Sequence, residues 1–179
     1  MKEIEVLVSL EDTLSEAKNK LCNFKLHNHK KTIDTYYTHK KLISLHPSSS
    51  GRLSSCLRIR ENNQDCFMTY KKDHFSPTDE WLYSDELETK VESAYINKEI
   101  LTKLGFYELV IVNSDKYTYH YDKNFHLILE NVLNLGVFLE IEYSNNSDIT
   151  DVDTIKNEIR QRIKDLGFVN CKEMNAGKP

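Results

Sequence analysis

The sequence is poor in the residues that break regular structure. Its 179 residues include only five glycines and three prolines, which excludes a low-complexity or linker protein. No apolar run approaches the roughly 18 residues that a membrane helix needs. The N-terminus lacks the basic start and apolar stretch of a signal peptide. We therefore expect a chain without a membrane partner.

Cysteine and net charge are also low. The four cysteines, Cys22, Cys56, Cys66 and Cys171, include no C-x-x-C pair, so neither a zinc knuckle nor a redox pair is indicated. We expect free thiols in the cytoplasm. The formal net charge of −4 argues against a general nucleic-acid binder, which would need a basic surface.

Hydrophobic spacing predicts about eight strands and few helices, which indicates the α+β class. Residues 2–10 alternate as a strand, and Ser9 is expected to cap a helix over 11–23. Further helices are predicted at 95–104 and 152–166, and residues 32–46 resemble two short strands around a polar turn. Residues 1–171 should form one domain, followed by a disordered tail over 172–179.

Like charges recur in pairs, two residues apart, on otherwise apolar strands. The pairs are Glu3/Glu5, Arg58/Arg60, Glu86/Glu88 and Glu140/Glu142. Residues at this spacing share one face of a strand. A solvated sheet face explains any single pair. Several pairs of both signs also fit a barrel whose lumen holds a metal ion and a polyphosphate, because carboxylates suit Mg²⁺ or Mn²⁺ and guanidinium groups suit phosphate.

Six segments then give the sequence a recognisable pattern. In chain order they are Glu3-Ile4-Glu5, Asp34-Thr35-Tyr36-Tyr37, Leu57-Arg58-Ile59-Arg60, Thr69-Tyr70-Lys71, Glu86-Leu87-Glu88 with the helix into Leu104-Gly105-Phe106, and Leu135-Gly136-Val137-Phe138-Leu139-Glu140-Ile141-Glu142. The series resembles the CYTH family of triphosphate tunnel enzymes, which includes class IV adenylate cyclases and thiamine and inorganic triphosphatases. The spacing is most similar to the class IV adenylate cyclase branch.

The resemblance implies an eight-stranded antiparallel β-barrel, forming a tunnel with flanking helices, and a role for each charged pair. Mg²⁺ or Mn²⁺ would be held by Glu3, Glu5, Glu140 and Glu142. A nucleoside, inorganic or other organic triphosphate would be bound by Arg58, Arg60, Lys71 and Lys116. Catalysis would involve Lys71, Lys116 and Glu130, with Glu86 and Glu88 in support. The resemblance leaves open whether the chain forms a homodimer.

Four positions depart from the family pattern. Leu7, Ser84 and Ser114 stand where the family has basic residues, and Glu130 stands where it has Asp. The expected lumen then holds six acids and four bases, a net charge of −2, or −3 with Glu130. Such a site would repel a triphosphate of about −4 unless divalent cations were bound, so we expect anion binding to depend strictly on metal.

The sequence leaves three functions open. An enzyme could hydrolyse a triphosphate or convert ATP to cyclic AMP and pyrophosphate, whereas the lost bases favour a binding barrel with little turnover. A barrel kept only as a scaffold is the third. The histidines His27 and His29 are interpreted as a polar segment rather than a metal site.

Overall fold

The computed structural model describes residues 2–63, 65–143 and 151–177. Within these ranges the strands are β1 Lys2–Leu10, β2 Lys25–His39, β3 Ser55–Asn62, β4 Cys66–Phe75, β5 Trp81–Val91, β6 Phe106–His120, β7 Phe125–Val132, β8 Gly136–Tyr143 and β9 Cys171–Glu173. The helices are α1 Leu14–Lys20, α2 Ala94–Lys103 and α3 Val152–Asp165, with a 3₁₀ turn at Ile43–Leu45. None of the described helices is long and apolar enough to cross a membrane.

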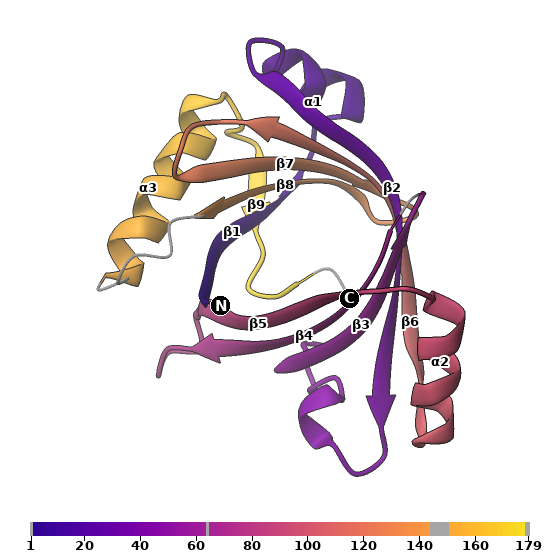
Figure 1. Cartoon of the computed structure of the whole chain (residues 1–179). Helices are drawn as coiled ribbons and strands as arrows, with labels where there is room; N and C mark the ends of the chain where they lie inside the picture. Colours follow the sequence, from indigo (N-terminus) through magenta and orange to yellow (C-terminus); the bar gives the residue numbers. More distant parts are fainter. Residues whose placement is uncertain (1, 64, 144–150, 178–179) are drawn as a thin grey trace.

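Eight strands close into an antiparallel barrel, as predicted. They pair in the order β5-β4-β3-β2-β6-β7-β8-β1, and β1 also pairs with β5. That last seam is short, because only Lys2 and Glu3 of β1 have partners on β5. Figure 1 shows the ring of strands end on, with α1 and α3 on one side of the barrel and α2 on the other.

The alternation of β1 separates two apolar layers. Ile4, Val6 and Val8 are buried outside the barrel in a core that includes Ile159 and Ile163 of α3. The other face of β1 points into the barrel, where Leu7 joins a second apolar cluster with the side chains of Tyr36, Trp81, Val112, Val132 and Phe138. The interior therefore has an apolar part as well as a charged one.

Helix α1 begins later than the sequence predicted. Thr13, not Ser9, is its N-cap: the Glu16 N–H donates to the Thr13 hydroxyl, and the Thr13 N–H donates to the Glu16 carboxylate at 2.8 Å. This is a complete capping box, which satisfies donors that the first turn leaves free. Ser9 stays in strand β1, where it pairs with Phe138.

Two other predictions also need correction. Residues 32–46 are not two strands around a turn, because one long strand, β2, runs to His39 and pairs with both β3 and β6. The tail is not disordered at residues 172–177: Cys171–Glu173 pair with Val8–Leu10 of β1, on the edge that β5 leaves open. Residues 178–179 of the predicted tail lie outside the described residues.

Candidate functional site

The barrel encloses a cavity of about 310 Å³ that residues from all eight strands line. Every predicted site residue is among them: Glu3, Glu5, Arg58, Arg60, Lys71, Glu86, Glu88, Lys116, Glu130, Glu140 and Glu142. The spacing argument is thus correct about location, because each charged pair faces inward. The roles of these residues stay predictions.

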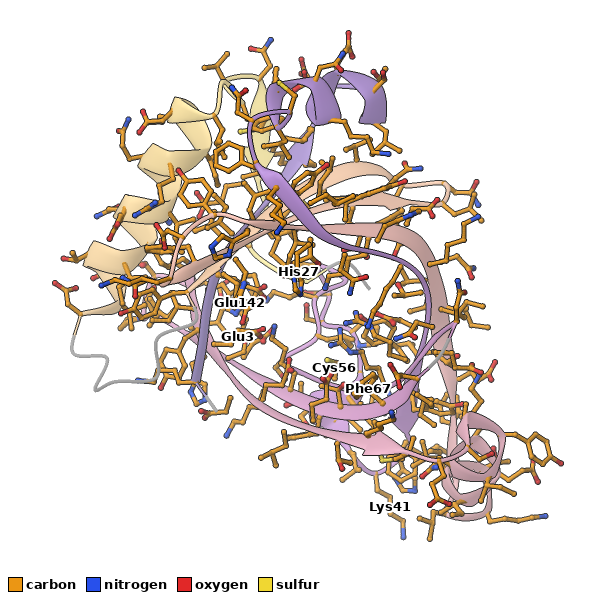
Figure 2. The ribbon with its side chains drawn as sticks, turned by 45° about the horizontal axis from the view of Figure 1, so that its top comes forward. Glu3, His27, Lys41, Cys56, Phe67 and Glu142 are labelled. Carbon is orange, nitrogen blue, oxygen red and sulfur yellow. The ribbon has the colours of Figure 1, made fainter. Side chains whose placement is uncertain are left out.

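One wall of the cavity is acidic. Glu5 and Glu142 stand directly opposite each other on paired strands β1 and β8, and Glu140 is paired with Leu7. In Figure 2, Glu3 and Glu142 lie together on the β1 side, across the barrel from Cys56. Like charges placed opposite each other destabilise a sheet unless a cation or a proton lies between them.

Burial, with the repulsion between neighbouring carboxylates added to it, raises the pKa values of this wall. Burial, followed by the charges of Glu3 and Glu140, raises the pKa of Glu142 to about 8. The pKa of Glu5 is raised well above its usual value by burial, and Glu140 and Glu3 add to the effect while Lys71 opposes it. These raised pKa values favour protonation of the wall, whereas a bound cation would favour its ionised form.

Lys71 lies against the same wall. Its Nζ is 2.8 Å from Glu5 Oε1 and forms a second ion pair with Glu3. Although burial opposes it, these two carboxylates raise the pKa of Lys71 well above its usual value. The ammonium group therefore stays charged and occupies the place between two predicted metal ligands. Its β5 neighbour in the ladder is Glu86.

The two arginines on β3 differ in how they are held. Arg60 binds Asp34 through two hydrogen bonds of 2.7 and 2.6 Å. Arg58 makes only longer ion pairs, at 3.7 Å to Asp34 and 3.8 Å to Glu88, and its buried Nε has no hydrogen-bond partner among the described residues. Because a buried guanidinium donor is costly to leave unpaired, Arg58 is the base best placed to take a phosphate oxygen.

Asp34 was quoted in a motif but was not predicted as a site residue. Burial alone would raise its pKa, yet the hydrogen bonds and charge of Arg60, helped by Arg58, bring it below the usual value. Asp34 therefore remains ionised and orients Arg60. Its register opposite Arg60 could not be read from the sequence.

Ser114, one of the positions where the family has a basic residue, contacts Glu130. Ser114 donates to Glu130 Oε1 at 2.5 Å, and its hydroxyl also lies 2.8 Å from that of Thr32. Lys116 is opposite Glu130 on the neighbouring strand. The serine thus holds a carboxylate that faces the predicted substrate-binding lysine.

One end of the cavity is largely apolar. Leu7 and Ser84, two positions where the family has basic residues, lie there. Leu7 belongs to the inner apolar cluster, and Ser84 donates to Asp73 at 2.7 Å while accepting from Trp81 Nε1 at 3.2 Å. Tyr36, Val112 and Cys56 of the same apolar cluster also line the cavity, as do Leu53, Ala176 and Gly177. The sequence did not point to it, because its residues come from distant segments.

The carboxylates suit a divalent metal by their chemistry. Within the described ranges, however, no three His, Cys, Asp or Glu side chains converge as a ready-made metal site. Hard oxygen donors, mutual repulsion and raised pKa values fit Mg²⁺ or Mn²⁺, provided that Lys71 leaves its position. The described residues that line the cavity include no histidine. His29 stacks on Tyr117 and bonds Asp115 at 3.3 Å.

Charge in the cavity is more negative than the sequence predicted. Asp34 and Asp73 join the expected residues, so nine carboxylates face four bases among the described lining residues. The formal excess is five negative charges before protons or cations are counted. An anion would enter such a site only with cations.

The comparisons with known proteins agree with this geometry. The model of the CYTH domain matches residues 1–170. A protein of Methanocaldococcus jannaschii named as a putative adenylate cyclase is 33% identical over 115 residues, which span 63% of this chain and 62% of that relative.

Two solved structures share the fold. A protein of Pyrococcus horikoshii superposes with a TM-score of 0.78 at 22% identity, covering 95% of this chain and 93% of its own. A putative adenylyl cyclase of Hippeastrum, described as having a dominant triphosphatase activity, superposes with a TM-score of 0.60 at 17% identity, covering 99% and 92%. At such identities these two likenesses show the fold alone.

Proposed function

The chain belongs to the CYTH domain family, and from that premise we propose that it binds a triphosphate in its barrel and hydrolyses a phosphoanhydride bond. The observation that carries the proposal is the division of one cavity into an acidic wall and a basic wall. Glu5 and Glu142 face each other on the acidic wall. The basic wall contains Arg58, whose Nε has no hydrogen-bond partner among the described residues, and Arg60, which Asp34 orients.

The basic wall would hold the substrate. Arg58 has an unpaired donor, Arg60 is oriented by Asp34, and Lys116 lines the same cavity. Charged hydrogen bonds to phosphate oxygens contribute about 1.5–3 kcal/mol each. Glu88 helps to keep Arg58 in place, since it also accepts from the Thr69 hydroxyl at 2.8 Å.

The acidic wall would hold Mg²⁺ or Mn²⁺ through Glu3, Glu5, Glu140 and Glu142. A bound divalent cation supplies charge neutralisation and alignment of the phosphates. Lys71, once it no longer pairs with Glu3 and Glu5, has an ammonium group to offer to the substrate. Glu86, its neighbour on β5, would then orient it.

Hydrolysis needs few further parts. A water oxygen would bond to the terminal phosphorus while the bridging P–O bond breaks and its electron pair stays on the departing diphosphate. The water would lose a proton to solvent, which leaves orthophosphate as the second product. Lys71 and Lys116 would stabilise the charge that develops on the phosphate oxygens. Glu130, opposite Lys116 and fixed by Ser114, would position that lysine.

Conversion of ATP to cyclic AMP is the second candidate. The name of the Methanocaldococcus jannaschii relative supports it. In that reaction the ribose 3′-hydroxyl attacks the α-phosphorus and pyrophosphate leaves, so the cavity would also have to hold an adenosine group. Hydrolysis is favoured because water needs no nucleoside site.

Product analysis tests the proposal. The protein is incubated with inorganic triphosphate, thiamine triphosphate or ATP in Mg²⁺ and in Mn²⁺, next to the Arg58→Ala variant and an Arg52→Ala control. Arg52 pairs with Asp79 on the outside of the site. Orthophosphate that is lost only in Arg58→Ala supports a triphosphatase, and cyclic AMP with pyrophosphate supports a cyclase. No product from any pairing refutes catalysis on these substrates.

A further inference from the structure

The segment that follows β9 forms a wall of the cavity. The Met174 N–H donates to the Leu7 carbonyl at 2.8 Å, and the Met174 side chain packs on the inner apolar cluster. Ala176 and Gly177, which follow Met174 by two and three residues, line the cavity. In Figure 1 this segment crosses the space inside the ring of strands.

Asn175 fastens the segment to the opposite side of the barrel seam. Its side-chain oxygen accepts from the Trp81 N–H at 2.6 Å, and its amide donates to the Asp79 carbonyl at 2.6 Å. Met174 is bound to β1 and Asn175 to the start of β5. The segment therefore bridges the two strands whose direct pairing involves only Lys2 and Glu3 of β1.

The cavity is small for a ligand site. Its volume of about 310 Å³ lies at the lower end of the roughly 300–1,000 Å³ that small-molecule pockets span. That is enough for inorganic triphosphate, whereas a nucleoside triphosphate has more than twice as many non-hydrogen atoms. Charged side chains from all eight strands line the cavity. A bulky substituent would therefore need the space next to the inner apolar cluster, which includes Trp81 and Cys56.

We propose that residues 174–177 are a specificity-determining wall, which limits the site to triphosphates without a bulky organic group. The inference rests on the proposed function, because it assumes that the triphosphate lies at the charged end. The segment acts by occupying space: it excludes a nucleoside rather than binding the phosphates.

Two variants test the proposal. One chain ends at Met174 and so keeps the apolar contact, and Asn175→Ala removes only the two side-chain hydrogen bonds. Asn170→Ala, at an exposed position five residues earlier, is the matched control. Calorimetry in Mn²⁺ gives the dissociation constants of inorganic triphosphate and of an ATP analogue with a nonhydrolysable β–γ bridge. Alkylation of Cys56, followed by peptide mass spectrometry with Cys22 as internal standard, reports independently on access to this end.

The full chain and Asn170→Ala should bind inorganic triphosphate more tightly than the analogue. Both test variants should bind the analogue at least about tenfold more tightly than the full chain does, the scale on which pockets discriminate by size. Inorganic triphosphate should change little, and Cys56 should be alkylated faster.

Three results would overturn the proposal. Faster alkylation without tighter analogue binding would show that a nucleoside does not use this end. Unchanged alkylation in both variants would show that the segment does not cover it. If the full chain bound no triphosphate at all, the proposed function would fail and the selectivity with it, while the alkylation rates would still decide whether the segment closes the cavity.

Discussion

Replacing Lys71 by methionine should strengthen the binding of a divalent cation and weaken the binding of triphosphate. The ammonium group pairs with Glu3 and Glu5, two of the carboxylates that would hold the metal. A cation must break these pairs before it can use the same oxygens. Methionine keeps most of the length and the apolar stem of lysine but removes the charge.

The size of the effect follows from the contacts. A hydrogen bond between charged groups contributes about 1.5–3 kcal/mol, and each 1.4 kcal/mol is about tenfold in affinity. Loss of the ion pairs also leaves the carboxylates more prone to bind protons, which offsets part of the gain. We therefore expect Mn²⁺ alone to bind about tenfold or more tightly to Lys71→Met at pH 8. Inorganic triphosphate in saturating Mn²⁺ should bind about tenfold or more weakly.

Isothermal titration calorimetry measures both affinities without any turnover. Lys72→Met is the matched control, because Lys72 is the exposed neighbour on the same strand, and it should leave both affinities unchanged. Equal or weaker Mn²⁺ binding by Lys71→Met would refute the reasoning, since it would show that the ammonium does not compete with the metal.

Three further predictions concern stability and reactivity. Ile159 is fully buried between α3 and the barrel, so Ile159→Ala should reduce the free energy of unfolding by about 2–5 kcal/mol, measured by urea unfolding. A loss below about 1 kcal/mol, roughly that of a surface change, would contradict this packing. Because Asp34 has a lowered pKa, its pairing with Arg60 contributes stability above pH about 4, and this stability is lost as the pH falls through the lowered pKa. Asp34→Asn should therefore be less stable than the parent at pH 7, and the difference should be smaller at pH 3. An equal difference at both pH values would contradict the ion pair. Burial raises the pKa of the Cys56 thiol to about 11, which leaves about 0.1% thiolate at pH 8. Iodoacetamide should therefore modify the exposed Cys22 long before Cys56. Comparable rates, measured by mass spectrometry, would argue against the burial of the Cys56 thiol.

The barrel and its charged lumen could be predicted because they depend on local patterns. Alternation on β1 separates Ile4, Val6 and Val8 from Glu3 and Glu5, and the same rule holds for Arg58 and Arg60. Strand pairing then brings these faces together. The predicted acids and bases therefore line one cavity, although their spacing along the chain is irregular.

What the sequence could not reveal depends on register and on distant contacts. The pairing of Asp34 with Arg60 needs the alignment of β2 with β3. The apolar end needs Leu7 of β1 and Trp81 of β5, which are far apart in the sequence, to meet at the seam between these strands. The ordered segment after residue 171 has no strong hydrophobic period of its own, and it is held by backbone pairing to β1 and by the side chain of Asn175. Such contacts leave little trace in local composition.

The most direct test of the account is to titrate inorganic triphosphate into the protein with and without a divalent cation. The cavity has nine carboxylates and four bases among its described lining residues, so the account predicts binding in Mn²⁺ or Mg²⁺ and none in excess chelator. Binding that is equally tight in chelator would contradict the role of the acidic wall. No binding under either condition would contradict the claim that this barrel is a triphosphate site.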